Sequence, residues 1–329
     1  MISRSTQILI SEVTPPVPRQ PDVIRRKSAT HRKRSALALA LLPVLVAAGG
    51  CSKTTNTNQA NSQAPQNTTS ATSPAPTPAQ GASPAADDKG DFKLAYVPVK
   101  NEQHEHLEKM LTDSKLFDRF TDDLNKNLAL PFDIDISFKE CADLPEAQQM
   151  GAANAWYNPD DHTVTMCYEL MAKSEELFRD DEKTPEDLAE AVKGSTAWTF
   201  YHELGHAMID VYKLPLTGKN EDAADQISTN ILIDGGDEGE KFALSGAEDF
   251  GREAGADNDL NDLQFADTHS LDKQRFYNIV CWVYGQNEAK YGNLIEQGSL
   301  PENRAPRCKE EYDTMARSWQ TLLAPHMKS

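Results

Sequence analysis

A stretch without large apolar side chains limits where this 329-residue chain can fold. Residues 52–90 consist almost entirely of Thr, Asn, Gln, Ser, Pro, Ala and Gly. No core can form there to offset the entropy that a chain loses on ordering. We therefore predict a disordered linker over residues 51–90. The folded domain is expected over residues 91–329, which are enough for one sizeable core.

The segment before the linker has the order of an export signal. The run His-Arg-Lys-Arg at 31–34 precedes an apolar run at 36–46, and small residues then lead to Cys51. The apolar run is too short for a bilayer-spanning helix but suits a signal peptide. The small residues resemble the lipobox of bacterial lipoproteins, although Ala48 stands where Leu is commonest. This resemblance implies that residues 1–50 are a lipoprotein signal peptide and that Cys51 becomes the lipidated N-terminus.

Lipidation at Cys51 implies a location in the bacterial cell envelope, with the membrane as a partner through the lipid. The face would be the periplasmic side of the outer membrane or the cell surface. The alternative is a plain secretory signal or an uncleaved anchor. A net charge of −18, with no basic stripe to offset it, argues against nucleic acid as a partner. The oligomeric state cannot be read from the sequence.

Four cysteines follow Cys51, and an even number in an exported domain predicts two disulfides. Three pairings are possible. We expect Cys141–Cys167 and Cys281–Cys308, because each of these pairs closes a short loop. No spacing is C-x-x-C, which argues against a structural zinc knot. The alternative is a set of free, buried thiols.

The expected elements change in kind along the domain. Apolar residues at helical spacing predict a helix over 102–127, and alternation at 132–138 predicts a half-buried strand. The stretches 152–157 and 163–168 flank a Pro/Asp turn, which is typical of a β-hairpin. Thr184-Pro185 and the acids after it predict a helix start, and helical patterns then continue to the end. A small early sheet followed by helices predicts an α+β fold with a mostly helical C-terminal lobe.

The sequence His202-Glu203-Leu204-Gly205-His206 lies inside an apolar helical stretch. Residues four apart lie on one face of a helix, so two imidazoles can bind one ion there. Neutral imidazole nitrogen suits Zn²⁺. Glu203 lies about 100° further round the helix, where its carboxylate can accept a proton from a zinc-activated water. The alternative is a helix that carries two ordinary histidines.

A third protein ligand is expected downstream. Glu221 and Asp225 are again four apart at the start of a helical run. Glu221 could bind the metal, while Asp225 accepts the second N–H of His202 or His206, as outer partners of metal-bound histidines do. Asp222 remains an alternative ligand. Acidic residues at a helix start also occur for capping and dipole reasons alone.

The two motifs together resemble those of the gluzincin metallopeptidases, the thermolysin-like clan. The resemblance implies a zincin-like fold and one Zn²⁺ per chain. It also implies that Glu221 is the third ligand and that Asp225 contacts a ligand histidine rather than the metal. The spacing of 15 residues from His206 to Glu221 is shorter than in thermolysin itself.

The resemblance extends to the hairpin, where Asn154, Ala155, Trp156 and Tyr157 resemble the edge strand beside the active-site helix in gluzincins. In that clan an extended peptide pairs with this strand through main-chain hydrogen bonds. The resemblance implies a small mixed sheet with an antiparallel edge strand over the active-site helix, and a substrate-binding role for these four residues. Alternatively, Trp156 and Tyr157 simply pack in the sheet.

The polar run from Asp267 to Tyr277 is the next candidate for catalysis. Zinc peptidases need a donor for the developing oxyanion, often His, Tyr or Arg. His269 is our first choice, followed by Tyr277 and Arg275. The alternative is capping of a helix expected over 271–284.

The domain also resembles a bacterial family of metallopeptidases that is catalogued as a domain of unknown function (4344). The matching stretches are Asn154–Tyr157, Cys167–Glu169, His202–His206, Glu221–Asp225 and His269–Gly285. We therefore expect a zinc metallopeptidase that acts on a peptide or protein substrate. The alternative is an inactive zinc-binding lipoprotein that acts as a scaffold or binding module, for which an intact Glu203 would be unnecessary.

Overall fold

The first described residues lie close to the backbone of the sheet. The computed structural model describes residues 88–256 and 265–328, so the predicted signal peptide, Cys51 and the linker up to residue 87 lie outside the described part. Both Lys89 and Gly90 donate their backbone N–H to the carbonyl oxygen of Leu130, at 2.7 and 3.0 Å. A Cβ on Gly90 would lie 1.9 Å from the carbonyl carbon of Phe132, so only glycine fits this approach.

Four strands form one mixed sheet in the order β1-β2-β4-β3. The strands are β1 (Phe92–Tyr96), β2 (Ile134–Lys139), β3 (Ala155–Asn158) and β4 (Thr163–Cys167). The pairs β1–β2 and β2–β4 are parallel, and β3 joins β4 antiparallel as an edge strand. Alternating residues Ile134, Ile136 and Phe138 are buried, as the period of two predicts. The same alternation in β1 was not used to predict that strand.

The helix predicted over 102–127 is interrupted. A short 3₁₀ turn (Glu102–His104) leads into α1 (Glu105–Ser114), and α2 (Leu116–Asn127) follows. Lys115 between them has a φ of 53°, a left-handed conformation that ends α1. Leu111 and Phe117, on either side of the break, are both fully buried. Apolar periodicity continues across Lys115, so it could not reveal the break.

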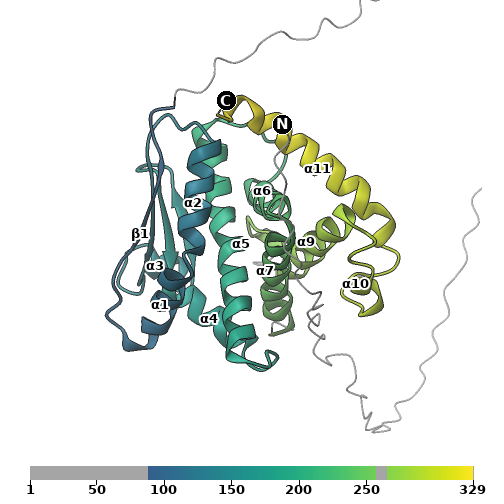
Figure 1. Ribbon diagram of the computed structural model, residues 1–329, viewed down its shortest axis with the longest axis horizontal. Helices are drawn as coiled ribbons and strands as arrows, with labels where there is room; N and C mark the ends of the chain where they lie inside the picture. Colours follow the sequence, from purple (N-terminus) through teal and green to yellow (C-terminus); the bar gives the residue numbers. More distant parts are fainter. Residues whose placement is uncertain (1–87, 257–264, 329) are drawn as a thin grey trace, which may run out of the picture. The chain divides into compact units, whose positions relative to one another are not determined.

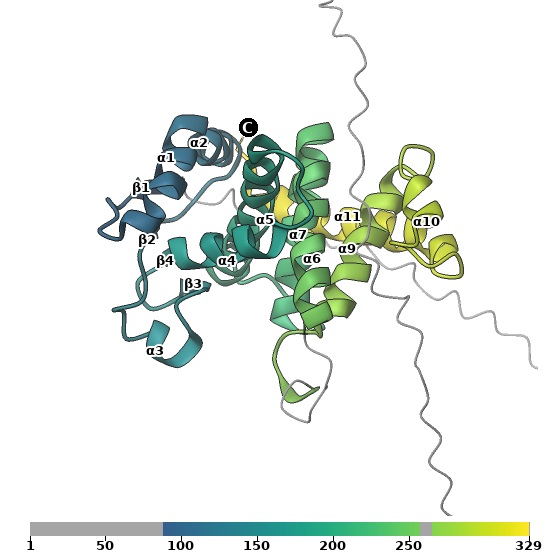
Figure 2. The same ribbon diagram turned by 90° about the horizontal axis from the view of Figure 1, so that it is seen from below.

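The long helix α5 (Pro185–Val211) is central to the fold. It begins as predicted, with the Thr184 side chain accepting the backbone N–H of Asp187 at 3.1 Å. Figures 1 and 2 show the sheet with α1 and α2 on one side of α5, and α6, α7 and α9 on the other. Because it has neighbours on both sides, α5 is buried almost all round from Val192 to Ile209.

The other regular elements of the described domain are helices, which confirms the α+β class with a mostly helical C-terminal part. They are α3 (Ala147–Met150), α4 (Tyr168–Phe178), α6 (Asn220–Asp234), α7 (Gly236–Ala256), α9 (Asp272–Gln286), α10 (Asn293–Glu296) and α11 (Cys308–Leu323), with 3₁₀ turns at Ala305–Arg307 and Ala324–His326. None of the described helices is both long and apolar enough to cross a membrane.

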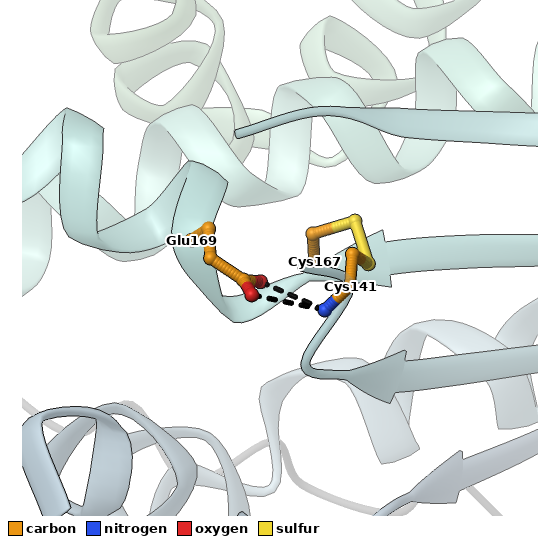
Figure 3. Close-up of side chains that lie close together, drawn as sticks. All are labelled: Cys141, Cys167 and Glu169. Atoms are coloured by element: carbon orange, nitrogen blue, oxygen red, sulfur yellow. Dashed lines mark hydrogen bonds between the residues drawn. A yellow bond between two sulfur atoms is a disulfide. The ribbon is translucent and has the colours of Figure 1, made fainter. Parts of the chain in front are cut away.

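Both disulfides have the expected pairing. Cys141–Cys167 and Cys281–Cys308 have Cα–Cα distances of 5.5 and 5.0 Å. Beside the first, Glu169 accepts the backbone N–H group of Cys141 at 3.0 Å (Figure 3), and it also accepts that of Ala142 at 3.0 Å. The sulfur atoms and this carboxylate lie close enough to suggest a metal site, but the disulfide consumes both thiolates. This cluster therefore anchors the loop that leads to β3.

Candidate metal centre

A close approach of two helices brings the candidate ligands together. Gly205 lies between the two histidines of α5, and a Cβ there would be 3.1 Å from the Cα of Ala224 on α6. Small residues at this crossing let the two backbones lie close. The start of α6, which carries Glu221, therefore lies against the face of α5 that carries His202 and His206.

Three donor atoms converge where the helices meet. The Nε2 atoms of His202 and His206 are 3.1 Å apart, and Oε2 of Glu221 lies 3.3 and 3.2 Å from them. Two donors bound to a tetrahedral zinc ion at about 2.0–2.1 Å lie about 3.3 Å apart. The three separations therefore fit a single zinc-sized ion.

The protonation chemistry supports the same fit. Oε2 of Glu221 is buried and has no hydrogen-bond partner among the described residues, although three imidazoles surround it. Burial raises the pKa of Glu221, but contacts with His202, His206 and His269 lower it further, to well below its usual range. An ionised carboxylate facing imidazole nitrogens is a ligand set that Zn²⁺ prefers.

Outer partners orient both rings. Nδ1 of His202 lies 2.8 Å from Oδ1 of Asp225, and Nδ1 of His206 lies 2.8 Å from Oδ1 of Asn220. Oxygen atoms at these positions favour a proton on Nδ1, which leaves the lone pair of Nε2 free for a metal. The sequence suggested Asp225 but not Asn220, whose only signal is its place directly before Glu221.

Asp225 is itself held by Arg275. Its oxygens accept hydrogen bonds from Nη2 and Nε of Arg275 at 2.7 and 2.9 Å. Burial raises the pKa of Asp225, but Arg275 and His202 lower it more, to about 2. For His202, burial lowers the pKa, while Asp225 and Glu221 raise it more, to about 9. The buried histidine therefore lies among carboxylates that favour a positive charge at this point.

The carboxylates of Glu221 and Asp222, the two candidate third ligands, point to different places. Oδ1 of Asp222 accepts the hydroxyl of Ser270 at 2.7 Å, so its carboxylate is directed to the loop before α9. Asp222 is not part of the convergent donor group, whereas Glu221 is.

The three candidate oxyanion donors lie in different places. Nε2 of His269 is 2.9 Å from Oε2 of Glu221, so His269 lies at the candidate centre. His269 and Arg275 line one cleft, but the guanidinium of Arg275 is bound to Asp225. Tyr277 does not line this cleft and lies instead in a smaller groove.

A cleft of about 660 Å³ is lined by some of the candidate residues, although His206 and Glu221 are not among its lining residues. His202 and Glu203 line it from α5, and Asn154 and Ala155 line it from the edge strand β3. Trp156 and Tyr157 do not line the cleft. Trp156 packs near the Cys141–Cys167 disulfide, and the hydroxyl of Tyr157 donates to Asp210 at 2.9 Å.

The carboxylate of Glu203 is available to accept a proton. It is 6 % exposed and borders the cleft. Within the described ranges, its carboxylate has no hydrogen-bond or ion-pair partner. A buried carboxylate beside a metal centre and without a structural partner can act as a general base.

Comparison with known proteins gives one match. A family model described as "Putative metallopeptidase", number 4344 among the domains of unknown function, matches residues 96–323. The matched range contains every candidate ligand, the edge strand and both disulfides. No curated protein and no solved structure matches the chain.

Proposed function

The chain belongs to this metallopeptidase family, and from that premise we propose that it is a zinc-dependent peptidase with a gluzincin-like centre. His202, His206 and Glu221 hold one zinc ion per chain, and Glu203 is the general base. The observation that carries the proposal is the convergence of three donor atoms at separations of 3.1, 3.2 and 3.3 Å, beside an unpartnered Glu203.

Zinc, when bound, lowers the pKa of a water and polarises a carbonyl, which makes hydrolysis of a peptide bond possible near neutral pH. Glu203 accepts a proton from the attacking water and delivers it to the leaving amine. Asp225 and Asn220 keep the rings of His202 and His206 oriented throughout.

The substrate is proposed to bind as an extended strand along β3. The edge of β3 has no sheet neighbour beyond β4 among the described strands, and Asn154 and Ala155 border the cleft. An unpaired strand edge can add a peptide through main-chain hydrogen bonds. His269 is the proposed donor to the developing oxyanion, because it reaches the centre and Tyr277 does not.

The location is also a proposal. Lipidation of Cys51 after removal of residues 1–50 would tether the peptidase to the bacterial envelope through the linker. Export agrees with the two disulfides, which form in oxidising compartments. Metabolic labelling with a fatty acid should mark the wild type but not a Cys51→Ala variant. Labelling of that variant would contradict the lipid anchor.

The experiment is hydrolysis of casein and of cell-wall peptides by zinc-loaded wild type and Glu203→Gln. The proposal expects cleavage by the wild type only. If both proteins bind zinc and both are inert, the chain is instead a zinc-binding scaffold.

A further inference from the structure

One carboxylate in the cleft has no assigned partner. Four carboxylates line the cleft in the described part of the chain: Glu203, Glu253, Asp267 and Asp272. Glu253 forms an ion pair with Lys173, and Asp267 lies 3.0 Å from Nδ1 of His269. Glu203 serves the reaction itself. Asp272 is left with no hydrogen bond or ion pair to any described residue.

The carboxylate of Asp272 is only partly solvated. Asp272 is the first residue of α9 and is half-buried. Burial raises the pKa of its carboxyl group and the charge of Glu253 raises it further, while Arg275, Lys173 and His269 act in the opposite direction. These three groups have ion-pair partners elsewhere: Lys173 pairs with Glu253, Arg275 with Asp225, and His269 with Glu221 and Asp267. A partly desolvated carboxylate without an ion-pair partner attracts a cation.

The cleft also has apolar walls. Leu170 from α4 and Phe250 and Ala254 from α7 line it together with Asp272. A lysine or arginine side chain has an apolar stem and a charged head, and it is stabilised where apolar walls lead to a carboxylate. A short acidic or polar side chain lacks the apolar stem that packs on the walls, and it lacks the positive charge that compensates the carboxylate.

We propose that Asp272 makes the cleft a subsite for a basic side chain of the peptide substrate, a lysine or an arginine close to the scissile bond. The inference rests on the proposed peptidase function, because it places the basic group on a bound peptide. Lys273 also lines the cleft, but it is exposed and therefore solvated, so Asp272 has the larger effect on selectivity.

The test measures binding separately from cleavage. Zinc-loaded Glu203→Gln protein is titrated with fluorescent peptides that are identical except for one Lys, Gln or Glu. We expect the Lys peptide to bind at least about tenfold more tightly than the Glu peptide, with a difference that shrinks at high salt. Adding Asp272→Asn should abolish the difference, and adding Asp272→Lys should reverse it.

Asp180→Asn is the matched control, since Asp180 is exposed, lies outside the cleft and has no partner among the described residues. It should leave the preference unchanged. Equal binding of the three peptides, a preference that survives Asp272→Asn, or tighter binding of the Glu peptide would each overturn the inference.

Cleavage of the same peptides by the wild type separates the two proposals. Charge-selective binding without any hydrolysis would refute the peptidase function and leave the subsite standing. Hydrolysis without a charge preference would refute the subsite alone. If no peptide binds, both proposals are wrong.

Discussion

Oδ1 of Asp225 lies 2.8 Å from Nδ1 of His202, so one helix orients a candidate metal ligand of another. Asp225→Asn should weaken zinc binding about 10–100-fold, because the carboxylate that fixes the ring and increases its basicity is lost. Competition with a chelator measures this affinity. Asp222→Asn is the control, since Asp222 contacts Ser270 rather than an imidazole, and it should leave the affinity unchanged.

Removal of the same carboxylate should also destabilise the fold. Asp225→Ala leaves the guanidinium of Arg275 buried without its partner, which costs about 3–5 kcal/mol in free energy of unfolding. Urea denaturation of the metal-free protein measures this loss. Asp225→Asn keeps a hydrogen-bond acceptor there and should cost less. An Asp225→Asn variant as stable as the wild type would show that the charge of Asp225 has no structural role.

Glu203→Gln should remove activity while the metal remains. The amide cannot accept a proton, so kcat should fall by at least about 10²–10⁴-fold. Because Glu203 is not among the convergent donors, the zinc content should stay at the wild-type value. Retained activity in the zinc-loaded variant would assign the base to another residue.

The pH dependence of the metal-free protein should reflect His202. Its pKa is raised from 6.5 in the unfolded chain to about 9 in the folded protein. The folded state therefore binds the proton more tightly, and this contribution to stability is fully present below about pH 6.5. The free energy of unfolding should fall as the pH rises through 9. Denaturation in chelator across this range measures it, and a His202→Asn variant should lack that part of the dependence.

The crossing of α5 and α6 should tolerate little added volume. Gly205→Ala places a methyl group about 3.1 Å from the Cα of Ala224, so α6 must move away from α5. We expect a loss of about 1–3 kcal/mol in unfolding free energy and weaker zinc binding, because Glu221 moves with α6. Gly218→Ala has open space and is the matched control. Unchanged zinc affinity in Gly205→Ala would contradict the role of this contact.

The spacing of residues along single helices predicted four residues of the candidate site. The i, i+4 spacing places His202 and His206 on one helix face, and the acidic residues of α6 supplied Glu221 and Asp225 by the same rule. Gly205 gave no signal in the sequence, because its importance lies in the nearness of Ala224. Residues four apart interact within one helix, but which two helices meet depends on tertiary packing.

Other features depended on packing that local patterns do not encode. Trp156 and Tyr157 belong to the expected edge strand, yet their side chains lie outside the cleft that Asn154 and Ala155 border. The helix breaks at Lys115, although the apolar periodicity of the sequence continues across this residue. The lack of an ion-pair partner for Asp272 could not be predicted either, because it depends on which charged groups of the cleft pair with one another.

Imidazoles from α5 and a carboxylate from α6 are proposed to bind one zinc ion. The most direct test is the metal content of the purified protein, measured by mass spectrometry for the wild type, His206→Ala, Glu221→Ala and Glu203→Gln. We predict about one zinc per chain in the wild type and in Glu203→Gln, and loss of zinc in the other two. A wild type that binds no zinc, or a Glu221→Ala variant that keeps a full equivalent, would contradict the claim.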